Sequence, residues 1–302
     1  MSSRKQPRIT NIWSKILKNE DGDFFTKIVI ESTGTFEYET SRRGNDIVLE
    51  ASGVVANMPE GSIEVNDGLV REISLSQTGP DTATVVICPE HPAGFKLEVS
   101  EGIPVGTAII LERAFLVELL KDKKIVIDPG HGGEDWGGKG PVNLIEKNIV
   151  VPIANNLKKL FEQQGAWVVL TRNGDENISF DRRITMAINE KADLFISIHT
   201  YSNEDSKVSG AAVLYGSACR ESSDIAKLIK EGLLKKLKLV DRGLKESTEY
   251  AALDSVPAVE VEVVTITNWV EEGLLRSPTV HKKAAEGIFN GIKNYFAIAG
   301  RQ

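Results

Sequence analysis

Two of the four histidines in this 302-residue chain occupy positions where a parallel α/β sheet would bind a ligand. His131 lies in the segment 128–133 (DPGHGG), which directly follows an apolar run, and His199 ends another apolar run. Open α/β sheets bind ligands outside the carboxyl ends of their strands, so we expect the two imidazoles to meet in one crevice. The glycines beside His131 let the backbone turn sharply there.

Two imidazoles at the rim of a sheet are suited to binding a divalent metal. Open catalytic zinc sites often combine two histidines with one carboxylate and leave a position for water. Glu146 is the candidate carboxylate, since it stands at the predicted start of a helix and can reach the strand ends. The helix dipole alone would also explain an acidic residue there, and a single histidine at a strand end is more often a packed residue. The combination on three elements favours a metal site of His131, Glu146 and His199.

Metal-assisted hydrolysis also needs a base that takes a proton from water. The apolar run 259–264 contains two carboxylates, Glu260 and Glu262, which the two-residue period of a strand places on the same face. Carboxylates are rarely buried without a partner, so at least one should face a site or a salt bridge. An edge strand with one solvated face is the alternative, and alternation alone does not choose between the two glutamates.

The elements that must position these residues alternate between strand and helix from residue 124 onward. The predicted strands are 125–127, 167–170, 194–198, 211–215 and 259–266, and the predicted helices are 145–164, 180–190, 222–237 and 280–296. This alternation predicts an open, mostly parallel α/β sheet with helices on both faces.

The first third of the chain has a different pattern. Short β-rich runs, separated by Gly, Pro, Asn and Asp turns, recur between residues 25 and 111 and are typical of a small all-β sandwich. Residues 1–15 show little periodicity, and we expect a frayed start. The predicted organisation is a β-sandwich domain at 1–112, a linker at 113–123 and a catalytic domain at 124–302.

Composition excludes several classes of protein. The chain is 41 % hydrophobic and 26 % charged, so it can bury a core and is not disordered. No apolar run approaches the roughly 18 residues of a membrane span. The net charge is −7 and neither half is basic, which removes the electrostatic basis for binding nucleic acid. Cys88 and Cys219 form no CxxC motif, which argues against a disulfide framework or a thiolate zinc site.

Residues 124–297 resemble the zinc-dependent N-acetylmuramoyl-L-alanine amidases of the Amidase_3 family. The matching segments follow the order of the family, namely IDPGHGG at 127–133, Glu146-Lys147, Thr171-Arg172, Arg183 with Ala187, ADLFISIH at 192–199, DRGLK at 241–245 and PAVEVE at 257–262 through Asn268. The resemblance implies that His131, Glu146 and His199 bind one zinc ion and that Glu262 is the catalytic glutamate. The sequence departs from the family at Thr200-Tyr201 and at Val263-Val264, where Ala-Asn and Gly-Phe are usual.

The resemblance also implies a function and a cellular location. The expected reaction is hydrolysis of the amide bond between N-acetylmuramic acid and L-alanine, as in an autolysin that takes part in peptidoglycan catabolism. Residues 20–113 resemble, more weakly, the AMIN domain, which implies binding to the cell wall. Peptidoglycan as substrate implies the cell envelope or the extracellular space. The first thirty residues contain no apolar signal core, so the chain as written is either cytoplasmic or a mature or truncated exported protein.

Two alternatives to an amidase are kept open. One is another zinc peptidase on a similar scaffold, such as a carboxypeptidase, and the other is a non-catalytic cell-wall-binding regulator. Protein partners are not predicted. Among the remaining polar residues, Asp128 and Glu134 are candidates for orienting His131, and a turn-stabilising role is equally open for Asp128. Arg183 is either a cleft residue or the partner of a sheet-end carboxylate, and His281 is expected at the surface.

Overall fold

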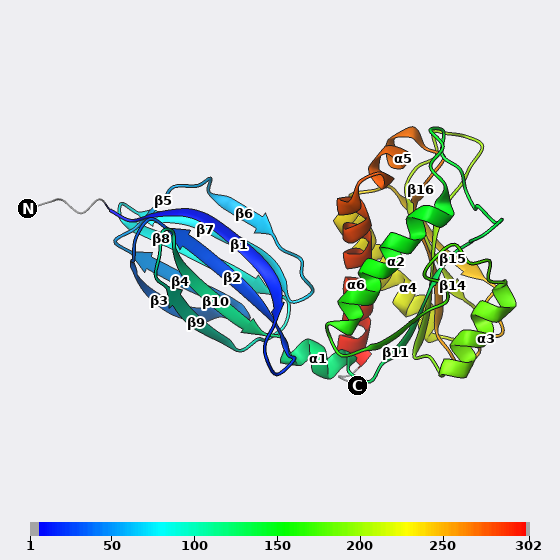
Figure 1. Ribbon diagram of the computed structural model, residues 1–302, viewed down its shortest axis with the longest axis horizontal. Coiled ribbons are helices and arrows are strands. Elements are labelled where there is room, and N and C mark those ends of the chain that lie inside the picture. The colour runs from blue at the N-terminus through cyan, green and yellow to red at the C-terminus, as the bar shows by residue number, and fades with distance from the viewer. Residues whose placement is uncertain (1–5, 300–302) are drawn as a thin grey trace, which may run out of the picture. The chain divides into compact units, whose positions relative to one another are not determined.

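The computed structural model describes residues 6–299, and the chain divides into two compact units, Met1–Leu116 and Val117–Gln302. The first unit consists of two five-stranded sheets, with the orders β5-β1-β2-β10-β9 and β3-β4-β8-β7-β6 (Figure 1). Its strands are β1 (Arg8–Lys18), β2 (Phe24–Ser32), β3 (Glu37–Arg43), β4 (Asp46–Ser52), β5 (Val55–Ala56), β6 (Gly61–Glu64), β7 (Val70–Gly79), β8 (Thr82–Pro89), β9 (Phe95–Ser100) and β10 (Val105–Glu112). The helix α1 (Ala114–Leu120) follows them.

The period-2 pattern of the strands produces the core of this first unit. Alternate apolar side chains from both sheets are buried in one cluster, among them Ile28 and Ile30 of β2 and Val85 and Ile87 of β8. Side chains of a strand alternate between its two faces, so each sheet contributes one apolar face to a shared interior.

The expectation of a frayed start is wrong for residues 8–15, because β1 pairs with β2 in antiparallel register along its length. The pairing register shifts between Ile9 and Asn11, and both Ile9 and Ile12 are buried. A bulge of this kind changes which residues share a face, and it breaks the alternation that would have revealed the strand. Residues 1–5 lie outside the described residues.

The second unit is a six-stranded mixed sheet with the order β12-β11-β13-β16-β14-β15. Its strands are β11 (Lys124–Pro129), β12 (Trp167–Leu170), β13 (Leu194–Tyr201), β14 (Ala211–Gly216), β15 (Asp241–Ser247) and β16 (Ala258–Thr265). The four strands β12, β11, β13 and β16 are mutually parallel, and β14 joins β16 antiparallel and pairs with β15 in parallel. The carboxyl ends of β11, β13 and β16 therefore meet at one edge, which carries the site described below.

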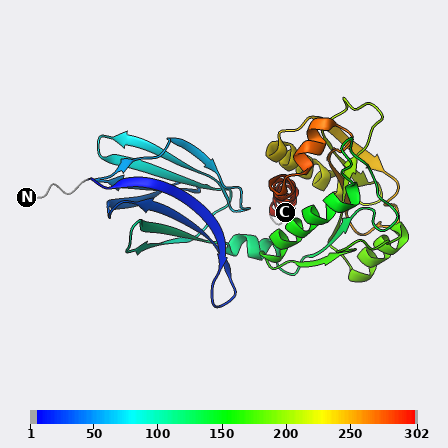
Figure 2. The ribbon, with the colours of Figure 1, turned by 45° about the horizontal axis from the view of Figure 1, so that its top comes forward.

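Helices cover both faces of this sheet, as the alternation of elements predicts. They are α2 (Glu146–Glu162), α3 (Phe180–Glu190), α4 (Glu221–Leu237), α5 (Trp269–Leu275) and α6 (Pro278–Ala299). Apolar residues of α2, α4 and α6 form one core with the sheet, and those of α3 belong to a separate core cluster. Figures 1 and 2 show α3, in yellow-green, on the side of the sheet opposite to α6, in red. No helix within residues 6–299 has the length and apolar character needed to cross a membrane.

Candidate metal centre

The loop that follows β11 brings His131 to the edge of the sheet in a left-handed conformation, with a φ of 62°. A Cβ atom at Gly130 would overlap the imidazole of His199, and a Cβ atom at Gly137 would overlap the imidazole of His131. Only glycine lets the backbone come so close to the two rings. The glycines of this loop are therefore required for the two imidazoles to approach one another.

Two buried arginines hold the backbone of this loop. Arg172 donates from Nη2 to the carbonyl of Gly130 at 2.6 Å, and Arg183 donates from Nη2 to the carbonyl of His131 at 2.7 Å. Arg183 also forms an ion pair with Asp128 at 2.6 Å, so it is the partner of a sheet-end carboxylate. Buried carbonyls need donors, and these guanidinium groups fix the path of the chain through His131.

The carboxylate that contacts Nδ1 of His131 was not predicted from the sequence. Asp135 lies 2.9 Å from Nδ1 of His131, whereas Glu134 is exposed. Asp128 accepts hydrogen bonds from Thr171 and Ser197 and supports the loop rather than the imidazole itself. The separation of four residues within one glycine-rich loop was the available signal for Asp135.

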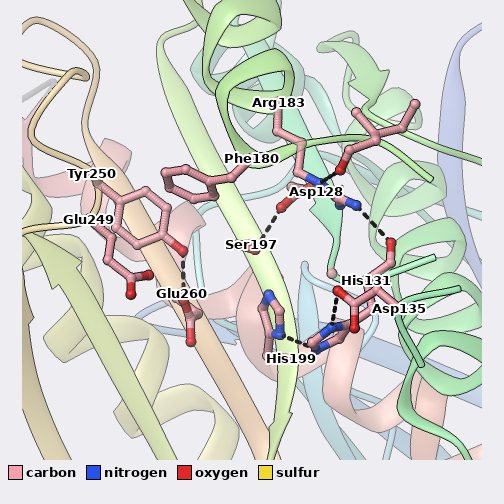
Figure 3. A pocket seen from close by; sticks show the side chains of 12 residues that line it. Asp128, His131, Asp135, Phe180, Arg183, Ser197, His199, Glu249, Tyr250 and Glu260 are labelled. Carbon is pink, nitrogen blue, oxygen red and sulfur yellow. Dashed lines mark hydrogen bonds and ion pairs between the residues drawn. The ribbon is translucent and has the colours of Figure 1, made fainter. Parts of the chain in front are cut away.

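The side chains of His131, Glu146 and His199 converge, with donor atoms that all lie within 4.8 Å of one another. Oε1 of Glu146 is 3.2 Å from Nε2 of His131 and 3.1 Å from Nδ1 of His199. The two imidazoles lie next to each other in Figure 3, with their planes at 80°. Glu146 is 2 % exposed. The carboxylate of Glu146 also accepts hydrogen bonds from the backbone N–H groups of Gly138 and Thr200, both at 2.7 Å.

The charges of these three groups are strongly coupled. Burial raises the pKa of Glu146, but hydrogen bonds from His131 and His199 outweigh it and hold that pKa well below its usual range. Burial lowers the pKa of His199, yet the carboxylates of Glu146, Glu260 and Asp128 raise it to about 9. Burial also opposes protonation of His131, and the pKa of His131 nevertheless rises because of Glu146. A divalent cation would displace the imidazole protons, whose positive charge otherwise balances the carboxylate of Glu146.

The donor set fits zinc. Two imidazole nitrogens and one carboxylate oxygen are the ligands that open catalytic zinc sites use. The contact between Asp135 and Nδ1 of His131 directs the other ring nitrogen, Nε2, toward Glu146 and His199. A carboxylate that binds the second nitrogen of a ligating histidine is a common feature of zinc sites.

The two glutamates of β16 share a face of the sheet, as the alternation predicts, but they have different partners. Glu262 is the register partner of His199 on the adjacent strand, and its carboxylate accepts a hydrogen bond from Nη2 of Arg242 at 2.7 Å. Glu260 accepts a hydrogen bond from the hydroxyl of Tyr250 at 2.6 Å. Of the two, Glu262 lies nearer to the carboxyl edge of the sheet, whereas Glu260 lines the cavity together with His199 and its charge acts on that imidazole.

A cavity of about 260 Å³ adjoins the two imidazoles. Its wall includes the aromatic rings of Phe180 and Tyr250 and the carboxylates of Asp135, Glu249 and Glu260, as Figure 3 shows. A concave site that combines aromatic surface with a few polar groups is typical of a binding site for small ligands. The remaining histidine of this unit, His281, is 8 % exposed and its Nε2 lies 2.6 Å from the carbonyl of Leu275, so the expectation of a surface residue is wrong.

Comparison with known proteins agrees with this architecture. Residues 125–294 match the Amidase_3 family, described as N-acetylmuramoyl-L-alanine amidase. The chain is 35 % identical over 182 residues to the "probable cell wall amidase LytH" of Staphylococcus epidermidis, a match that covers 59 % of this chain and 60 % of LytH. The chain thus spans less than two thirds of the length of that relative.

Two solved structures share the fold. One is the N-acetylmuramoyl-L-alanine amidase AmiC2 of Nostoc punctiforme, with a TM-score of 0.55 and 30 % identity over 58 % of this chain and 97 % of that chain. The other is the catalytic domain of CwlV, an N-acetylmuramoyl-L-alanine amidase of Bacillus (Paenibacillus) polymyxa, with a TM-score of 0.55 and 31 % identity over 58 % and 99 % of the two chains.

The fold and the site therefore define an α/β domain with a candidate metal centre at the carboxyl edge of its sheet. The family match extends over more than half of the chain, and the chain belongs to the Amidase_3 family of N-acetylmuramoyl-L-alanine amidases.

Proposed function

We propose that this chain is a zinc-dependent N-acetylmuramoyl-L-alanine amidase that hydrolyses the amide between N-acetylmuramic acid and L-alanine in peptidoglycan. His131, Glu146 and His199 would hold one zinc ion, and Glu262 would be the catalytic base. The observation that carries the proposal is the convergence of three donor side chains from three separate elements, with Glu262 as the register partner of His199 on the adjacent strand.

Each group has a role in the proposed reaction. Bound zinc would lower the pKa of water and polarise a carbonyl group. Glu262 would accept the proton of the attacking water and return it to the alanine amine as the carbon–nitrogen bond breaks. Asp135 and the arginine-bound loop would hold the imidazole of His131 in its orientation. The products are a muramic acid carboxylate and a peptide with a free alanine amino group.

We also propose that the first unit is an AMIN-like domain that binds the cell wall, and that the protein acts in the envelope or outside the cell. Its two β-sheets and its position ahead of the catalytic unit support this role. Residues 1–120 contain 11 basic and 18 acidic residues. Attraction to anionic wall polymers by charge alone would therefore be unfavourable, and recognition would depend on specific contacts.

The test is an analysis of the products released from purified peptidoglycan by the zinc-loaded protein. An amidase releases stem peptides that begin with a free L-alanine, and mass spectrometry would detect them. A carboxypeptidase would release single C-terminal amino acids. A non-catalytic binder would sediment with the wall and release nothing, and either of these two results would refute the proposal.

A further inference from the structure

Arg242 of β15 presents a buried donor that no group of the described chain uses. Its side chain is 9 % exposed, and its guanidinium carbon lies 3.5 Å from the centroid of the Tyr201 ring. Nη2 binds Glu262 at 2.7 Å. The other terminal nitrogen, Nη1, is buried and has no hydrogen-bond partner within residues 6–299.

An unpaired N–H of a buried guanidinium is costly, on the order of 1–3 kcal/mol or more for a charged group. The face of Tyr201 attracts the cation as a whole but does not accept a hydrogen bond from its edge. Arg242 also acts electrostatically on Glu271, but the carboxylate of Glu271 already accepts hydrogen bonds from the backbone of Gly210 and Thr265. Residues 6–299 thus supply no acceptor for Nη1, which leaves a water molecule or a ligand to supply one.

The geometry of the ion pair between Arg242 and Glu262 also indicates that Nη1 binds a group from outside the described residues. Arginine and a carboxylate commonly pair through two parallel hydrogen bonds. The pair of Arg242 and Glu262 uses only one nitrogen of the fork. A guanidinium that served only to neutralise Glu262 would gain from using both nitrogens, whereas this arrangement keeps one donor available.

We propose that Arg242 is a catalytic residue that donates a hydrogen bond from Nη1 to the oxygen of the scissile amide. Nη1 and Nη2 are attached to the same carbon, so an acceptor of Nη1 lies next to the carboxylate of Glu262, where the proposed reaction takes place. The hydrogen bond strengthens as the amide oxygen gains negative charge during attack by water. This inference rests on the proposed amidase function and gives a role to a residue of the family-like segment 241–245 to which the resemblance assigns none.

The test compares two probes in protein that cannot turn over, the zinc-loaded Glu262→Gln variant. One probe is muramyl dipeptide, which contains the intact amide, and the other is its phosphinic analogue, in which a tetrahedral, negatively charged phosphorus group replaces that amide. Adding Arg242→Gln should raise the dissociation constant of the phosphinic analogue about 100-fold, the effect typical of one such donor. The dissociation constant of muramyl dipeptide should change only a few-fold.

Lys245→Gln is the matched control, because Lys245 also lies over the Tyr201 ring, at 5.3 Å, and is exposed. It should leave the affinity for both probes unchanged. If Arg242 acts only as the counter-ion of Glu262, then Arg242→Gln will not weaken binding of the analogue once Glu262 is a glutamine, and the inference fails. Zinc content and thermal melting identify a double variant that has lost its fold or its metal.

A second variant keeps the test decisive if the Arg242→Gln variant does not fold. Arg242→Ala, with Glu262 intact, should regain hydrolysis of muramyl dipeptide when free guanidinium is added at millimolar concentration, and absence of rescue in a folded, zinc-loaded variant would contradict the inference. Failure of the proposed function looks different. In that case wild-type protein itself would release no L-alanyl-D-isoglutamine from muramyl dipeptide, whatever residue 242 is.

Discussion

The two units of this chain use buried charge in different ways. In the first unit, Arg113 has a fully buried side chain and binds Asp67 at 3.0 Å and Thr26 at 2.7 Å. Asp67 in turn accepts hydrogen bonds from the backbone of Leu69 and Val70. Burial lowers the pKa of Arg113 and Asp67 opposes that effect. These charges satisfy one another around a turn, and their role is structural.

In the second unit the buried charges point toward one place. Glu146 turns its carboxylate to two imidazoles, and Arg242 keeps one nitrogen beside Glu262 without a partner among the described residues. Burial of such groups destabilises the folded state unless a ligand supplies the missing partners. The comparison shows that burial of charge alone does not mark a functional site. A functional site is marked instead by several polar groups that point to one place and still lack some of their partners.

The largest effect should come from Glu262. The variant Glu262→Gln keeps the shape of the side chain but cannot accept a proton, so the rate of amide hydrolysis should fall by roughly 10² to 10⁴. Zinc content should stay at the wild-type level. Glu260→Gln is the matched control, since an amide oxygen can still accept the hydrogen bond of Tyr250, and its loss should be much smaller. Equal losses in both variants would contradict the different roles of the two glutamates.

Next in size is the buried pair of the first unit. Arg113→Ala leaves the carboxylate of Asp67 without its charged partner and should reduce the free energy of unfolding by about 3–5 kcal/mol. Urea unfolding, followed by circular dichroism, measures this change. Arg71→Ala, which removes the exposed pair with Glu72, should cost less than about 1 kcal/mol. Hydrolysis of muramyl dipeptide should be unaffected by Arg71→Ala.

A smaller effect is expected where an arginine acts on the metal centre through the backbone. Arg183→Lys removes the fork that binds Asp128 and the carbonyl of His131, and the affinity for zinc should fall about 10- to 100-fold. Competition with a chromogenic chelator measures the affinity. Arg182→Lys changes the exposed neighbouring residue and should leave zinc affinity as it is. A similar loss in both variants would mean that the loop is not held by Arg183.

The smallest predicted effect is a dependence on pH. The pKa of His199 in the metal-free protein is raised to about 9, so this imidazole is protonated at pH 7 and must release a proton when zinc binds. Apparent zinc affinity should therefore increase about tenfold between pH 7 and pH 8. Over the same interval the metal-free protein should lose stability, because a raised pKa contributes stability that disappears as pH passes through it. Calorimetry in buffers of different ionisation enthalpy counts the released proton, and a proton count of zero would contradict this charge state.

Much of the second unit could be predicted because its sequence pattern and its structure obey the same periodicities. The helix predicted at 180–190 is α3 and the strand predicted at 167–170 is β12. His131 and His199 could be placed together because parallel strands end at a common edge. The shared face of Glu260 and Glu262 followed from the period of a strand.

Other features depend on contacts that a sequence does not express. The strand β1 escaped prediction because a bulge after Ile9 interrupts its alternation. The burial of His281 depends on α6 packing beside the end of α5, where the carbonyl of Leu275 is available. The single hydrogen bond between Arg242 and Glu262 depends on the position that the pairing of β14 with β15 gives to Arg242. These features arise from tertiary contacts, which local sequence preferences do not predict.

His131, Glu146 and His199 together should hold one zinc ion. Metal analysis after equilibrium dialysis tests this prediction directly, with the wild-type protein and the variants His131→Ala, Glu146→Ala and His199→Ala in parallel. About one zinc per wild-type chain is expected, removable by a chelator, with very little zinc in each folded variant. A wild-type chain that retains no zinc, or variants that bind it as well as the wild type, would show that these three residues do not form a zinc site.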